Sequence, residues 1–136
     1  MNFEREDRKQ RLARDRRSTE SEEDYLASIL ELLERKGYAR VADVAQSLSV
    51  VEPSACEMIK RLAQKGYLTR EKYRGFTLTE SGQAKADEVL TRRRTLMAFL
   101  QSLGLPQNVI IRDVHGLEHH LSEKTLQCFK RLMKAD

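Results

Sequence analysis

The segment from Val41 to Gly66 constrains the fold of this 136-residue chain more than any other, because its apolar side chains repeat with the period of two short helices. The first predicted helix, residues 41–48, is followed by a short polar turn, residues 49–52. Pro53 suits the first turn of a second helix, where a missing N–H donor is tolerated. The second helix is predicted to bury one stripe, made of Ala55, Met58, Ile59 and Leu62. Two short helices across a tight turn predict a helix-turn-helix.

Two β-prone runs follow this pair of helices. Residues 67–71 and 75–79 are separated by Lys72, Tyr73 and Arg74, which predicts a hairpin with an exposed basic tip. A hairpin in this place is the wing of a winged helix-turn-helix.

A further helix is predicted before the helix-turn-helix. Thr19 and Glu22 have the spacing of a capping box, so this helix is expected to begin at Thr19, and Gly37 supplies a left-handed stop. Residues 1–17 mix charges of both signs with few apolar groups and are expected to form a charged tail or a frayed helix. Their basic side chains give them some capacity to follow a DNA backbone, although a solvated tail is the favoured interpretation.

Helices are also predicted after the wing. A long one begins at Ser81 and ends near Pro106, because proline cannot continue it. One or two short helices follow over residues 109–121, and Ser122 is expected to cap the last helix. The apolar faces of these last helices are expected to form a dimer interface, with Leu117, Leu121, Leu126, Phe129 and Met133.

These elements predict a mostly α fold with a small β-hairpin. We expect a charged tail over residues 1–17, a winged helix-turn-helix DNA-binding domain over residues 18–80, and a linker helix with a helical dimerisation and metal-binding domain over residues 81–136. A chain this short buries one modest core, so the helical part is expected to complete its core by pairing with a second copy.

The composition narrows the class of protein. Twenty-five Lys and Arg against 21 Asp and Glu give a net charge of +4, which permits nucleic-acid binding without establishing it. No apolar stretch approaches the roughly 18 residues that span a bilayer, so neither a signal peptide nor a membrane segment is expected, and a cytoplasmic location follows. Cys56 and Cys128 share no motif and are expected to be free thiols.

The second helix of the helix-turn-helix carries the predicted DNA-reading surface. Its N-terminal residues face base edges in this motif, and its basic side chains suit phosphate. The candidate DNA contacts, including those of the wing, are Arg40, Ser54, Ala55, Glu57, Lys60, Arg61, Lys72 and Arg74. A solvated helix face beside a basic hairpin is the alternative interpretation, and the order of the elements favours DNA binding.

Several short motifs in this order resemble one family. They are EDY at residues 23–25, KGYARVADVA at 36–45, EKYRG at 71–75 and GLEHHLS at 116–122. From about Ser18 to its end the chain is similar to the manganese transport regulators, the two-domain branch of the diphtheria-toxin-repressor family. The resemblance implies a repressor of metal-uptake genes that binds palindromic double-stranded DNA as a homodimer. It also implies a metal between the two domains that favours DNA binding, and no small-molecule substrate.

A candidate metal site follows from spacing and from the resemblance together. His115, Glu118 and His119 stand at i, i+3 and i+4, so on a helix their side chains share one face. The resemblance implies that Asp24 joins them from the first helix, which makes a site of two imidazoles and two carboxylates. An acid in the first turn of a helix is also stabilising without any ligand, and that alternative stays open for Asp24.

Three positions depart from the pattern of the family. A carboxylate is expected at Ala27, a histidine at Arg93 and a carboxylate at His115. The resemblance implies Mn or Fe, whereas imidazole in place of carboxylate favours Zn, Fe, Co or Ni. Arg93 offers no lone pair, and its guanidinium is able to pair bidentately with Asp24 or Glu118 and so replace the cation. A metal-independent DNA-binding regulator with Arg93 as the cation mimic is therefore an alternative.

The sequence supports other classes of protein less well. His115 to His119 spell the H-x-x-E-H string of inverted zinc metalloproteases, but only 17 residues follow and a third zinc ligand is needed. A DNA-binding scaffold that senses nothing is a further alternative. No nucleophile constellation or glycine-rich phosphate loop is present in the sequence, so no enzymatic activity is expected.

Overall fold

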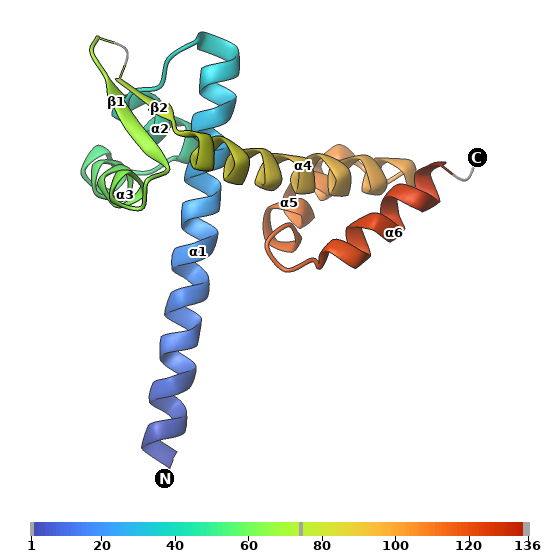
Figure 1. Cartoon of the computed structure of the whole chain (residues 1–136). Coiled ribbons are helices and arrows are strands. Elements are labelled where there is room, and N and C mark those ends of the chain that lie inside the picture. Colours follow the sequence, from blue (N-terminus) through green and yellow to red (C-terminus); the bar gives the residue numbers. More distant parts are fainter. Residues whose placement is uncertain (1, 74, 135–136) are drawn as a thin grey trace. The chain divides into compact units, whose positions relative to one another are not determined.

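The computed structural model describes residues 2–73 and 75–134, with the side chains of residues 15–18 left aside. Six helices and one two-stranded antiparallel sheet make up its regular structure (Figure 1). The chain divides into two compact units between Ala86 and Asp87. The prediction of a mostly α fold with a small hairpin is confirmed.

Unit 1 is the winged helix-turn-helix. It contains α1 (Asn2–Lys36), α2 (Val41–Leu48), α3 (Glu52–Gln64), β1 (Leu68–Glu71), β2 (Gly75–Leu78) and the start of α4 (Glu80–Ser102). Its core is formed by buried side chains of α1, α2, α3 and the hairpin, among them Leu26, Ile29, Val44, Ile59, Leu62 and Phe76.

The start of α1 differs from the sequence prediction. The helix begins at Asn2 and runs through Thr19, so the predicted start at Thr19 is wrong. Residues 2–14 are exposed and consist largely of strong helix formers, and the ion pair between Asp7 and Arg11, at 3.3 Å, adds i,i+4 support. Gly37 ends the helix as predicted, with φ +80°.

The helix-turn-helix was predicted correctly from its apolar period. Ser49 adopts a left-handed conformation (φ 56°) after α2, and Pro53 lies in the first turn of α3. The stripe on α3 is buried at Ala55, Ile59 and Leu62. The spacing of buried residues therefore fixes which face of α3 remains exposed.

The wing is held against the segment that follows α1. In the hairpin Leu68 pairs with Leu78 and Glu71 with Gly75. The N–H of Phe76 donates to the carbonyl of Ala39 at 3.0 Å. At Gly75 (φ +81°) an added Cβ would lie 2.0 Å from that same oxygen, so the wing depends on glycine at this position.

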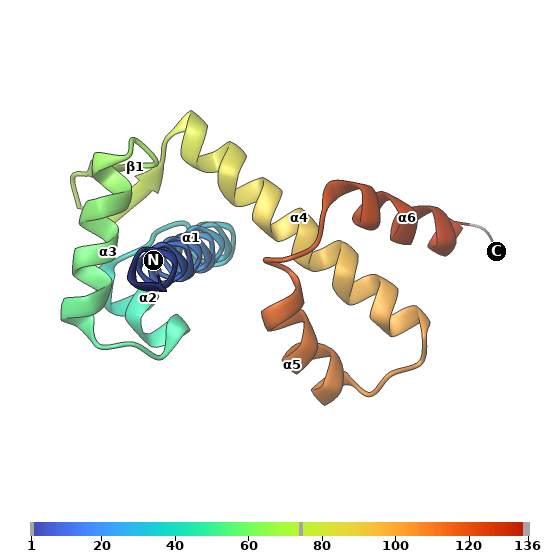
Figure 2. The same ribbon diagram turned by 90° about the horizontal axis from the view of Figure 1, so that it is seen from below.

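Unit 2 is helical and consists of the rest of α4, α5 (Gln107–Leu117) and α6 (Glu123–Lys134). Both short helices lie along the C-terminal part of α4 (Figure 2). Leu96, Ile110 and Val114 form the buried core, and the rings of Phe99 and Phe129 stack with centroids 4.1 Å apart. The predicted cap of the last helix is confirmed, since the Ser122 hydroxyl accepts the N–H of Thr125 at 3.3 Å. In the described part of the chain no helix is both long and apolar enough to cross a membrane.

Candidate metal centre and DNA-binding surface

The exposed face of α3 carries most of the predicted DNA contacts. Ser54, Glu57, Lys60 and Arg61 are exposed. Ala55 is different, because it is fully buried and belongs to the core stripe rather than to the exposed face. The exposed face therefore combines two small or acidic groups near the N-terminus of α3 with two basic groups further along it.

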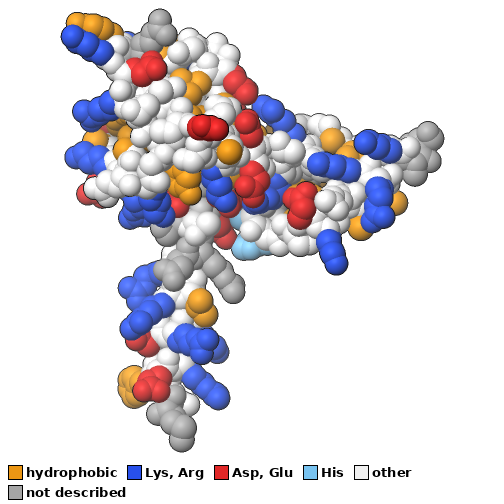
Figure 3. Space-filling view, viewed as in Figure 1, with side chains coloured by type: hydrophobic (Ala, Val, Ile, Leu, Met, Phe, Trp, Pro, Cys, Tyr) orange, Lys and Arg blue, Asp and Glu red, His pale blue; other side chains and the backbone are white. Residues whose placement is uncertain are grey.

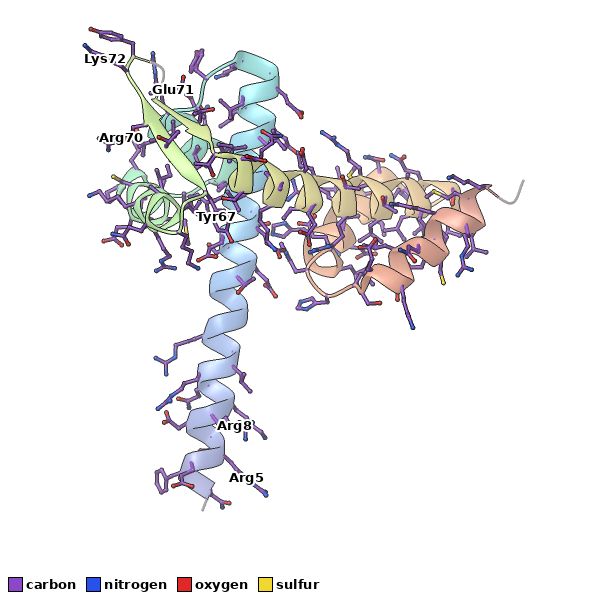
Figure 4. The ribbon with its side chains drawn as sticks, in the orientation of Figure 1. Arg5, Arg8, Tyr67, Arg70, Glu71 and Lys72 are labelled. Carbon is purple, nitrogen blue, oxygen red and sulfur yellow. The ribbon has the colours of Figure 1, made fainter. Side chains whose placement is uncertain are left out.

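The hairpin adds basic groups to the same unit. Lys and Arg side chains gather over α3 and the hairpin in the space-filling view (Figure 3). Lys72 projects from the tip of the hairpin, and Arg70 projects from β1 (Figure 4). Arg40 is exposed, with its guanidinium carbon 5.0 Å from the centre of the Tyr38 ring. Arg74 lies outside the described residues.

Arg70 was not among the predicted DNA contacts. Strict strand alternation would place Arg70 on the buried side with Leu68, yet Arg70 is exposed. Its positive charge, two residues before Lys72 in the sequence, was the available signal.

Glu118 and His119 form the centre of the candidate metal site in unit 2. Glu118 lies directly after α5, where its N–H donates to the carbonyl of Val114 at 3.0 Å, and it is only 1% exposed. The His119 Nε2 atom lies 3.4 Å from the Glu118 Oε1 atom, and the His119 side chain is 4% exposed. A buried carboxylate and a buried imidazole are thus in direct contact.

Arg93 on α4 forms an ion pair with the carboxylate of Glu118. Its Nε donates to Oε2 at 2.7 Å and a terminal nitrogen donates to Oε1 at 3.2 Å, which is a bidentate fork. The neighbouring Arg92 donates instead to the backbone carbonyl of Glu118, at 3.3 Å. Two consecutive arginines therefore hold the backbone and the side chain of Glu118.

His115 does not join this pair. We predicted that the three ligand-type residues share one helix face, but α5 ends at Leu117, and the helical bonding continues only through the N–H of Glu118, so His119 lies beyond the helix. Glu118, His119 and His120 lie in a turn, in which the N–H of His120 donates to the carbonyl of Leu117 at 3.0 Å. Among the described residues, the ligand-type group that contains Glu118 and His119 does not include His115, whose side chain is exposed on α5.

The remaining positions of the predicted site lie on α1 in unit 1. Asp24 is half-buried there, and Ala27 is fully buried and offers no donor atom. Ala27 thus belongs to the apolar core of unit 1.

The donor chemistry of Glu118 and His119 fits a transition metal. Two ligands at about 2.1 Å from a tetrahedral ion are about 3.4 Å apart, which matches the separation of their O and N atoms. One oxygen and one nitrogen donor suit Mn, Fe, Co, Ni or Zn. The fit holds for the pair itself, whereas Arg93 engages both carboxylate oxygens in this conformation.

A winged helix-turn-helix followed in the same chain by a helical unit with a carboxylate–imidazole pair defines the class as a DNA-binding transcriptional regulator. Two family models match the chain. The model described as "Iron dependent repressor, N-terminal DNA binding domain" matches residues 18–76, and "Iron dependent repressor, metal binding and dimerisation domain" matches residues 79–135.

Curated relatives and solved structures agree with this class. The chain is 44% identical over 104 residues to the HTH-type transcriptional regulator MntR of Lysinibacillus sphaericus, covering 76% of this chain and 75% of the relative. The MntR of Bacillus subtilis is 43% identical over 105 residues, covering 77% and 74%. The solved structure of IdeR from T. acidophilum has 30% identity and a TM-score of 0.74, covering 84% of this chain. The chain spans 54% of the length of that solved structure.

The chain therefore belongs to the iron-dependent repressor family and is a metal-dependent transcriptional regulator of the MntR type. Residues 2–17 lie before the first matched residue.

Proposed function

We propose that this regulator represses metal-uptake genes and that its operator affinity rises when a divalent transition metal joins the two units. The proposed ligands are Asp24, His115, Glu118 and His119. The observation that carries the proposal is the buried contact between Glu118 and His119 within the part of the chain that matches the metal-binding domain. His115 is proposed to become a ligand when the turn after α5 changes its conformation and brings Glu118 and His119 closer to it. Mn or Fe is the metal that the family favours, and the imidazoles also suit Zn, Co or Ni.

The proposed DNA partner is a palindromic operator bound by a homodimer in the cytoplasm. Two recognition helices must lie about 34 Å apart, or a multiple of it, to reach successive major grooves on one face of DNA. The proposed contacts are Arg40, Ser54, Glu57, Lys60, Arg61, Lys72 and Arg74, with Arg70 added and with Ala55 supporting α3 from the core. The proposed dimer interface contains Leu117, Leu121, Leu126, Phe129 and Met133. Leu117 is exposed, whereas Leu126 is buried and Leu121 and Phe129 pack on the core of unit 2, so these three would support the interface from beneath. A metal that fixes the spacing of the recognition helices acts on geometry rather than on new DNA contacts.

DNA affinity of metal-stripped protein, measured by fluorescence anisotropy with and without MnCl2 or ZnCl2, tests the proposal. Metal is expected to raise the affinity of the wild type about 5- to 150-fold, the range of typical allosteric coupling. His119→Ala should lose this response, because it removes one buried ligand. His120→Ala is the matched control, since His120 is the exposed neighbouring histidine and stands outside the proposed ligand set. An equal response in wild type and His119→Ala would count against the proposed site.

The fork between Arg93 and Glu118 favours a second candidate function, a regulator that needs no metal. In that case the guanidinium replaces the cation permanently. The metal-stripped protein would then bind its operator equally tightly with and without added metal, and a chelator would leave the affinity unchanged.

A further inference from the structure

We propose that Arg93 is an internal competitor of the metal, which holds the Glu118 carboxylate in the metal-free protein and must leave it before Glu118 becomes a ligand. Arg93 would thereby set the metal concentration at which the regulator responds. This inference rests on the proposed function and assigns a regulatory role to a residue that is not itself a metal ligand.

The first argument is that both oxygens of the carboxylate are engaged by a cation while the fork is in place. Both oxygens of Glu118 accept a hydrogen bond from Arg93, at 2.7 and 3.2 Å. The guanidinium keeps its positive charge at every pH at which proteins fold, and it has no lone pair to offer a cation. A metal bound to Glu118 beside Arg93 would therefore face a fixed like charge at close range.

The second argument is that Arg92 and Arg93 bond different groups of Glu118. Arg92 bonds the backbone carbonyl of Glu118, so the backbone stays anchored when Arg93 departs. The Arg93 side chain is 23% exposed, whereas the Glu118 side chain is 1% exposed. The arginine thus has access to water, and the buried carboxylate keeps a cationic partner whether guanidinium or metal is bound.

The third argument gives the size of the effect. When only a fraction of the molecules is competent to bind, the apparent dissociation constant rises by the inverse of that fraction. A fork that is closed in 90–99% of molecules would weaken metal binding about 10- to 100-fold. The fork opens before any metal arrives, so the same factor should apply to each divalent metal.

The test compares Arg93→Met with Arg94→Met by isothermal titration calorimetry of metal-stripped protein with MnCl2 and, separately, ZnCl2. Arg94 is the matched control because it is the exposed neighbour on α4 and its replacement changes the net charge equally. Arg93→Met is expected to bind both metals about 10- to 100-fold more tightly than wild type, with an unchanged Mn/Zn preference. Arg94→Met should stay within about twofold of wild type, as expected for a screened surface charge.

A measurement on the wild type avoids any folding defect of the variant. The Nε–H group of Arg93 should give a protected NMR signal in metal-free protein, because it donates to a buried carboxylate. Addition of ZnCl2 should shift this signal and speed its exchange with water. A signal that is unchanged at saturating zinc would overturn the inference.

The outcomes separate the inference from the proposed function. If wild type and Arg93→Met bind metal equally well, the competitor role is wrong and the metal site stands. If only Arg93→Met binds metal, Arg93 is a competitor that never releases Glu118 in the wild type. Metal sensing by the wild type is then refuted. If neither binds metal, both fail.

Discussion

Replacement of Gly75 by alanine should detach the wing from the segment that follows α1. Alanine at φ +81° costs about 1–2 kcal/mol. Its Cβ would also lie 2.0 Å from the Ala39 carbonyl oxygen, so that oxygen must move and release the N–H of Phe76. A lost hydrogen bond adds about 0.5–1.5 kcal/mol. We expect Gly75→Ala to lower the free energy of unfolding by about 1.5–3.5 kcal/mol in total.

Gly66→Ala separates the contact with Ala39 from the backbone strain. Gly66 has nearly the same φ, +83°, and nothing lies within 4 Å of an added Cβ, so only the cost of about 1–2 kcal/mol applies. Urea unfolding by circular dichroism measures stability, and hydrogen exchange at the Phe76 amide reports on unit 1 locally. The Phe76 amide should exchange faster in Gly75→Ala than in Gly66→Ala at matched stability. Equal exchange in the two variants would refute the reasoning.

Two further predictions concern DNA binding and pH. Lys72→Ala should weaken binding to all DNA sequences and reduce the slope of log affinity against log salt by about 1, because one phosphate contact is lost. Lys124→Ala on α6 is the control. An unchanged slope in Lys72→Ala would exclude a wing–phosphate contact. Burial raises the pKa of Tyr25 above its ordinary value of 10.0, so the neutral phenol stabilises the fold below pH 10 and this contribution is lost as the pH rises further. Urea unfolding between pH 9 and 11 should therefore show a steeper loss of stability in wild type than in Tyr25→Phe, and parallel curves would contradict a buried phenol.

The helix-turn-helix was predictable because its signals are local. The apolar period over residues 41–48 and the stripe on α3 each lie within one or two turns, and Pro53 marks the start of α3. The start of α1 was not predictable in this way. Thr19 has the chemistry of a helix cap, but residues 2–18 are good enough helix formers to continue the helix through it, so a local cap signal was overridden by the preceding segment.

The candidate metal site was predictable only in part. The ligand types at Glu118 and His119 follow from the sequence, but the end of α5 at Leu117 does not. Among the described residues, the ligand-type group that contains these two does not include His115. The N–H of Glu118 still donates to the carbonyl four residues earlier, but the next bond, from His120 to Leu117, is of the i to i+3 type, so helical spacing stops applying after Glu118.

The contact between Arg93 and Glu118 spans 25 positions, so no periodic pattern gives it, and it was expected from the resemblance alone, as one of two alternative pairings of Arg93. Charge gives a reason for it. Compared with the pattern that the resemblance implies, Ala27 and His115 each remove a carboxylate and Arg93 adds a cation, so each replacement makes the proposed site more positive. A more positive site attracts an added cation less strongly. Part of the negative charge of Glu118 is already neutralised by a cationic side chain of the protein. The same change that makes metal-free Glu118 tolerable in a buried position should therefore weaken metal binding, which is the direction expected if Arg93 is the proposed competitor of the metal.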